Sequence, residues 1–159
     1  MIERDKYVSV RYLLLLMVLI LGSCLSDNIY SGTEKIEGGS WNRYDKPVFM
    51  AEINDTVNPC DILITIRNTS SYEYRNIFLF IKTSSPHGLS IKDTVEYKLA
   101  DEKGNWFGKG LGDIHDISVP FKTNILFPEN GTYTFTVEQG MRNEDLEGIV
   151  DIGLRVIRK

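Results

Sequence analysis

The stretch DILITIRNTSSYEYRNIFLFI, from Asp61 to Ile81, decides the fold class. In its first half, isoleucines at every second position alternate with Leu63, Thr65 and Arg67, which is the period of a β-strand with one buried face. Its second half, IFLFI at 77–81, is apolar on both faces and predicts a central strand covered on each side. Asn68 to Ser71 between them are turn formers. We therefore expect two strands joined by a turn.

The same period of two recurs along the chain, and turn-forming residues separate the segments. The predicted strands centre on 48–53, 62–67, 77–81, 94–99, 117–121, 132–137 and 150–156. Pro120 cannot donate a backbone hydrogen bond, so its strand is expected at a sheet edge or at a bulge. The segment Met141 to Leu146 is expected to make one helical turn. This pattern predicts an all-β fold, a single antiparallel β-sandwich of about seven to eight strands.

The N-terminal stretch LLLLMVLILGSC, from Leu13 to Cys24, raises the question of a membrane span. As a helix, the apolar run 13–21 would be about 14 Å long against a hydrocarbon core of about 30 Å, so it is too short. Three basic residues precede the run and two small residues close it, as in a bacterial secretory signal. We therefore predict a cleaved signal peptide over residues 1–23.

The tetrapeptide Leu21-Gly22-Ser23-Cys24 resembles a lipobox, in which the cysteine thiol takes a diacylglycerol before cleavage and the new amine is then acylated. Two or more acyl chains hold a protein stably on a bilayer. We therefore expect Cys24 to carry the lipid anchor, palmitate among its chains. The alternative is an ordinary secretory signal. If Cys24 is lipidated, Cys60 is a lone thiol, which we expect to be a small apolar side chain that fills space at the start of a strand. The alternative is a disulfide bond between Cys24 and Cys60.

Residues 25–40, LSDNIYSGTEKIEGGS, show no sustained period and end in Gly38-Gly39-Ser40. We predict a lipidated N-terminus and short flexible tether over 24–40, whose ends as a random coil lie on the order of 20 Å apart. The β-sandwich domain is then expected over 41–159, a length sufficient to bury a core.

The formal net charge is −4, and loss of the signal peptide, with three basic and two acidic residues, makes it one unit more negative. No basic cluster is present. The charge pattern therefore gives no electrostatic reason to expect nucleic acid or an anionic lipid surface as a partner.

Candidate catalytic and metal-binding residues are few. His115 lies between Asp113 and Asp116, and a hydrolase or a divalent metal site requires these three side chains to converge. A structural metal needs about four ligands, and no second His or Cys cluster supplies them. We therefore predict a solvated loop with no metal, no cofactor and no enzyme activity. His87, in a Pro-Gly turn, is expected to be exposed.

The segment GNWFGKGLG, 104–112, is glycine-rich but lacks the GK[ST] ending of a phosphate loop, and no helical pattern follows it. It carries Trp106 and Phe107, which either cover the core, the favoured reading, or are presented at a partner-contact surface. Exposed aromatic residues on a sandwich would instead suit stacking on sugar rings. A periplasmic or surface glycan-binding module is therefore the alternative function, with candidates Trp41, Tyr72, Tyr74 and Trp106.

Two tripeptides, Asp55-Thr56-Val57 and Asp93-Thr94-Val95, resemble the Asp-Thr-aliphatic O-glycosylation site of periplasmic proteins in the Bacteroidota. Thr56 and Thr94 are therefore candidate modification sites. Both tripeptides also fit the start of a strand after a turn.

Several blocks of this chain stand in a characteristic order: the lipobox ending at Cys24, EINDT at 52–56, ITIRNTSSYEYRNIFLFI at 64–81, DTVEYKLADEKGNWFGKGLGD at 93–113, FPENGTYTFTVEQGMR at 127–142 and GIVDIGLRV at 148–156. In their order and spacing these blocks are similar to the gliding motility lipoprotein GldH family of the Bacteroidota. The likeness covers the chain from about Trp41 onward.

This resemblance implies a membrane-anchored, non-enzymatic envelope lipoprotein needed for gliding motility and associated with the type IX secretion machinery. Other gliding and secretion lipoproteins are the expected partners, beside the bilayer itself, and no active-site residue carries over from the family. Surface-exported relatives place several acids after the lipidated cysteine, whereas Asp27 is the single acid in Leu25 to Asn28. We therefore expect an outer-membrane anchor with the domain facing the periplasm.

Overall fold

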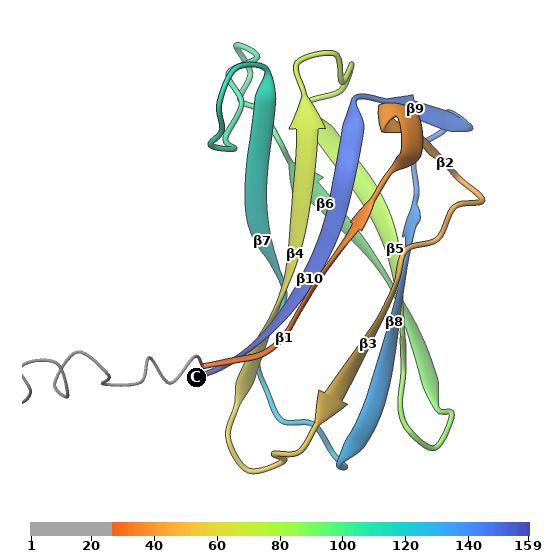
Figure 1. Ribbon diagram of the computed structural model, residues 1–159, viewed down its shortest axis with the longest axis vertical. Coiled ribbons are helices and arrows are strands. Elements are labelled where there is room, and N and C mark those ends of the chain that lie inside the picture. The colour runs from red at the N-terminus through yellow and green to blue at the C-terminus, as the bar shows by residue number, and fades with distance from the viewer. Residues whose placement is uncertain (1–26) are drawn as a thin grey trace, which may run out of the picture.

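The computed structural model describes residues 27–159, which form two four-stranded antiparallel sheets packed face to face (Figure 1). The first sheet has the order β1 (Asn28–Lys35), β10 (Ile149–Arg158), β4 (Cys60–Thr69), β7 (Ile114–Ile125). The second has the order β3 (Val48–Ile53), β8 (Gly131–Gln139), β5 (Asn76–Ser84), β6 (Ser90–Lys98). Short strands β2 (Ser40–Asn42) and β9 (Asp145–Glu147) pair beside them, and a 3₁₀ turn (Glu37–Gly39) precedes β2. The predicted all-β sandwich is confirmed.

The core lies between the two sheets and comes from alternate residues of their central strands. In β4, buried and half-buried positions alternate along the whole strand, as its sequence period predicts. The buried side chains of β4, β5 and β8 include Ile62, Ile64, Ile66, Ile77, Leu79, Ile81, Tyr133, Phe135 and Val137. Burying one such aliphatic or aromatic side chain stabilises the fold by about 1.5–3 kcal/mol.

All seven predicted strands are present. The edge position predicted from Pro120 is confirmed, because β7 pairs only with β4 and its register shifts where Leu63 meets Pro120. The prediction that IFLFI is covered on both sides is wrong. Strand β5 is central, yet Phe78 is exposed and Phe80 is half-exposed on the outer face, where the Lys92 ammonium lies 5.0 Å from the Phe80 ring centroid.

The tether prediction over 24–40 is wrong from Asn28 onward. Residues 28–35 form β1, which pairs antiparallel with β10, so the domain begins before Trp41. Because β1 is an edge strand, neither of its faces is fully buried, and the period that marks the other strands is absent. Residues 1–23 and Cys24 lie outside the described part of the chain.

The helical turn predicted over Met141 to Leu146 is also wrong. The chain bends there and enters β9, whose Leu146 pairs with Trp41 of β2. The backbone carbonyl of Asn143 accepts a hydrogen bond from the Gln139 side-chain amide, and the backbone N–H of Met141 donates to the same side chain. These bonds from a buried glutamine hold a bend where the local pattern favours a helix.

The sandwich has two ends, which we call proximal and distal. The proximal end carries the loops 54–59, 85–89 and 126–130 together with Asp27 and Lys159 (Figure 1). The distal end carries the loops 43–47, 70–75, 99–113 and 140–144. Within residues 27–159, no helix has the length and apolar character needed to cross a membrane.

Candidate functional site

The longest loop, residues 99–113 at the distal end, is organised by one carboxylate. Asp101 accepts hydrogen bonds from the backbone N–H groups of Lys103 and Asn105 and from the Asn105 side-chain amide, each at 2.8 Å. The Asn105 amide and backbone bonds, in that order, lower the pKa of Asp101 below its usual range. The segment Glu102 to Asn105 is therefore a closed Asx-type turn.

The glycines of this loop allow it to lie directly on β7. Backbone bonds join Lys109 and Asp116 in both directions, at 3.0 and 2.9 Å. A Cβ atom on Gly110 would lie 1.9 Å from the Ile114 carbonyl oxygen, and one on Gly108 would lie 2.9 Å from the Asp116 nitrogen. Only glycine permits this approach. The segment serves close backbone packing, in agreement with the predicted glycine-rich connection.

Trp106 and Phe107 have different environments. The Trp106 ring is half-buried, stacks on His115 at 5.3 Å between centroids and lies 6.4 Å from the Tyr72 ring. Phe107 is 52% exposed. Trp106 therefore supports the core, as favoured, and Phe107 is the residue presented to solvent.

Phe107 lines a groove of about 570 Å³ between the loops 70–75 and 99–113. We call it the Phe107 groove, and its charged lining residues are Glu73, Arg75, Glu96, Lys98, Asp101 and Glu102. Carboxylates outnumber basic groups in this set by two. An exposed aromatic ring beside mixed, net acidic charge suits contact with a polar protein surface.

The three residues weighed for catalysis or metal binding do not converge. The Asp116 carboxylate is held by the Arg67 guanidinium at 2.7 Å, and Arg67 also pairs with Asp151 at 2.7 Å. His115 Nε2 lies 3.1 Å from the Ser70 hydroxyl, while Asp113 meets Ser70 only through its backbone carbonyl. Across residues 27–159, no group of three His, Cys, Asp or Glu side chains is placed to hold a metal.

The aromatic residues proposed for a sugar platform are largely occupied within the fold. Trp41 is fully buried, and Tyr72 is buried with its hydroxyl donating to the Asn76 carbonyl at 2.9 Å. Burial raises the pKa of Tyr72. Tyr74 is half-buried and bonds to Asn143, so these residues do not form the exposed stacking surface that a glycan-binding module requires.

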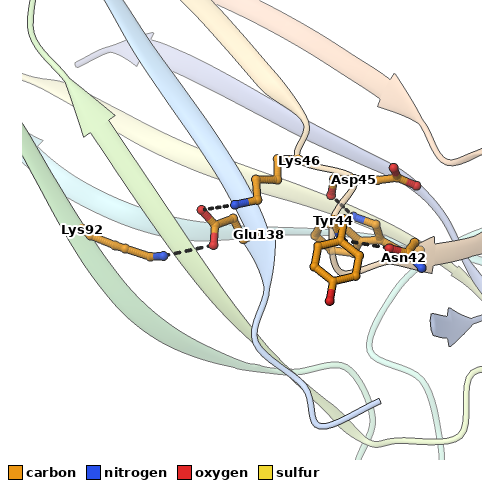
Figure 2. Close-up of polar contacts among 7 residues, drawn as sticks. Asn42, Tyr44, Asp45, Lys46, Lys92 and Glu138 are labelled. Atoms are coloured by element: carbon orange, nitrogen blue, oxygen red, sulfur yellow. Dashed lines mark hydrogen bonds and ion pairs between the residues drawn. The ribbon is translucent and has the colours of Figure 1, made fainter. Parts of the chain in front are cut away.

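On the outer face of the second sheet, ion pairs connect β8 with β6 and with the loop 43–47. Glu138 of β8 lies between Lys46, at 3.3 Å, and Lys92 of β6, at 3.0 Å (Figure 2). Burial opposes ionisation of Glu138, but the bonds from both lysines dominate and lower its pKa. Nearby, the Trp41 indole N–H donates to the Asp45 carbonyl at 2.8 Å. This face is structural in character.

The remaining predicted site residues are spread over the molecule. Thr94 is exposed on β6, and Thr56 is half-exposed in the loop 54–59, so modification of either stays a prediction. His87 is exposed as predicted and pairs with the Glu129 carboxylate. Cys60 is a buried free thiol at the start of β4, as predicted, and burial raises its pKa.

Fold and site together define an all-β sandwich protein with an exposed aromatic ring beside a charged groove on its distal loops. The chain belongs to the GldH lipoprotein family, whose model matches residues 28–156. It is 31% identical to the gliding motility lipoprotein GldH homolog of Christiangramia forsetii, over 91% of this chain and 93% of that protein. It is 27% identical to the gliding motility lipoprotein GldH of Flavobacterium johnsoniae, over 92% and 95%.

Family membership supports a gliding-motility lipoprotein with a lipid-anchored location in the cell envelope. Among solved structures, the periplasmic lysozyme inhibitor PliG of Aeromonas hydrophila covers 82% of this chain and 88% of its own, at 16% identity. The TM-score between the two structures is 0.33.

Proposed function

We propose that this chain is a non-enzymatic component required for gliding motility, associated with the type IX secretion machinery. Acyl chains on Cys24 anchor it in the outer membrane, and the domain faces the periplasm. The Phe107 groove is the surface through which it contacts other envelope lipoproteins.

The observation that supports this proposal is the exposure of Phe107 at the end of the sandwich opposite to Asp27, the first described residue. The loop that bears it is held by backbone bonds to β7, so the ring is presented from a defined position. An anchor before Asp27 places the distal end away from the bilayer, where envelope partners are accessible. Preorganised aromatic residues lose little conformational entropy on binding and commonly dominate such contacts.

Site-directed photo-crosslinking in cells tests the contact. A photoreactive amino acid at position 107 is expected to give adducts with envelope lipoproteins, identified by mass spectrometry. The matched control is position 44, because Tyr44 is also an exposed aromatic residue on a distal loop but lies outside the groove. Adducts that are absent at position 107, or identical at both positions, contradict the proposed contact.

The anchor is tested separately. Radiolabelled palmitate is expected to enter the wild-type protein and not Cys24→Ala, which should accumulate as uncleaved precursor. Density-gradient separation of the two membranes, followed by protease treatment of intact cells, then reports the membrane and the facing side. Wild-type protein recovered without palmitate from the periplasmic fluid contradicts anchoring.

A further inference from the structure

The proximal end contains an apolar pocket that neither the sequence pattern nor the distal site explains. It has a volume of about 460 Å³ and opens between β6 and β7, the edge strands of the two sheets. Its apolar lining includes Ile62, Ile91, Ile125, Leu126, Phe127 and Tyr133. The volume lies within the range of about 300–1,000 Å³ that is typical of small-molecule pockets.

The pocket exists because the two sheets separate at this corner. Strands β6 and β7 do not pair with each other, and the Lys122–Asp93 ion pair, at 2.9 Å, bridges them beside the opening. Ile91 faces inward from β6, yet it is 68% exposed. By contrast Ile81, which faces inward from the adjacent β5, is fully buried in the core.

Large apolar side chains surround the opening. Leu89 is 79% exposed and Leu126 is 57% exposed, and both line the pocket. Val57, on the third loop of the proximal end, is 81% exposed. Each of the three proximal loops therefore presents an apolar side chain to its surroundings, which is the pattern of a surface that meets an apolar partner.

The first described residues of the chain lie at this end. The carbonyl of Asp27 accepts a hydrogen bond from the backbone N–H of Arg158 at 2.7 Å, and β1 is paired with β10 from Asn28. Only Leu25 and Ser26 separate Cys24 from Asp27. Three residue steps span at most about 11 Å, so a lipid on Cys24 holds the proximal end close to the bilayer.

The pocket is within lateral reach of the same membrane surface. Strands β1 and β7 are separated by β10 and β4, which is three strand spacings of about 4.8 Å, or roughly 14 Å. If Cys24 carries the anchor, the pocket edge of the first sheet therefore lies roughly 14 Å, across the sheet, from the strand that follows the anchor.

We propose that this pocket takes an acyl chain of a phospholipid from the membrane that holds the anchor, with Leu89, Ile91 and Leu126 in contact with the lipid layer. The proposal rests on anchoring through Cys24. An aliphatic chain matches the apolar lining, and the three charged groups that line the pocket are each paired, Lys122 with Asp93 and Glu129 with His87. The sandwich then lies against the bilayer at its proximal end, with a fixed orientation.

The first measurement is the depth of the proximal end in the bilayer. Mature lipidated protein is placed in vesicles of zwitterionic phosphatidylethanolamine and phosphatidylcholine, with an environment-sensitive fluorophore on Leu126→Cys. Cys60 is buried, so the introduced thiol is labelled selectively. Spin labels on the lipid acyl chains are expected to quench this fluorophore and not one on the control Leu111→Cys, which is exposed at the distal end. Equal quenching at both positions, or none, overturns the proposal.

The second measurement asks whether the pocket itself is filled. A phosphatidylcholine with a photoreactive group in its acyl chain is expected to label peptides that line the pocket. Thr83→Phe projects a ring into the pocket and is expected to reduce this labelling at least about tenfold, because the ring displaces the apolar contacts of the chain. Thr132→Phe makes the same exchange on the outer face of β8 and is expected to leave labelling unchanged.

The outcomes separate the possible occupants. Labelling that is spread evenly over the proximal loops and insensitive to Thr83→Phe overturns the pocket. A pocket that stays unlabelled in correctly anchored protein also overturns the proposal, because the protein's own acyl chain or a segment of a partner then fills it. Palmitate incorporation is measured on the same sample, so failure of the anchor is distinguished from failure of the pocket.

Discussion

Replacing Ile36 with alanine tests directly whether the N-terminal segment belongs to the fold. Ile36 follows β1, is 5% exposed and belongs to the core, and its backbone N–H donates to the Val150 carbonyl at 2.8 Å. In a flexible tether, the same substitution would change the free energy of unfolding by no more than about 0.5 kcal/mol. The two interpretations therefore predict different stabilities.

The expected loss follows from the atoms removed. Ile36→Ala deletes three buried carbons at about 0.8 kcal/mol each, and the incompletely filled cavity adds to this, which gives about 2–4 kcal/mol. For a domain of this size, about 4 °C is lost per kcal/mol, so the melting temperature should fall by roughly 8–16 °C.

Urea unfolding followed by tryptophan fluorescence is a suitable assay, because Trp41 in the adjacent β2 is fully buried and reports its exposure. The control is Glu37→Ala, at the next and exposed position, which should unfold with the wild type. An Ile36→Ala protein with the wild-type midpoint and slope would refute the docking of residues 28–36.

Three further predictions concern the distal loop, the proximal loop and the buried thiol. Gly110→Ala places a Cβ atom against the Ile114 carbonyl, so crosslinking from position 107 should be lost while the melting temperature stays within a few degrees. Unchanged crosslinking would contradict the close packing of the loop 99–113 on β7. Bonds from Asn58 and Val57 lower the pKa of Asp55 from 3.8 to about 2, so its stabilisation is present above about pH 4 and is lost as the pH falls through 2. Wild type and Asp55→Ala should therefore differ in urea midpoint at neutral pH and converge at pH 2. Cys60 should react with a thiol reagent only on unfolding, which rate measurements across the urea transition will show.

The strands of the core could be predicted because their environment is uniform along their length. In β4, one face is buried and the other half-exposed, so the period of two appears directly in the amino acids. β1 lacks this signal because it lies at an edge, and a polar segment with one glycine is then compatible with either a strand or a tether. Its place depends on hydrogen bonds to β10, more than a hundred residues away in sequence.

The candidate site was only partly predictable for a similar reason. Trp106 and Phe107 are adjacent aromatic residues in a glycine-rich loop, and nothing local distinguishes them. Their separation into a half-buried ring and an exposed one follows from the stacking of Trp106 on His115, which β7 supplies. The buried states of Trp41 and Tyr72 likewise depend on β9 and on the neighbouring loops.

The amino-acid sequence by itself determined the all-β class and the seven principal strands, since strand period and turn chemistry are local properties, and its resemblance to known sequences indicated the family. The tertiary structure alone decided that the chain is folded from Asn28, that Phe107 is the exposed aromatic residue, and that a pocket opens between β6 and β7. These features depend on the spacing of two sheets and on contacts between distant segments, and no periodicity along one strand encodes either of them.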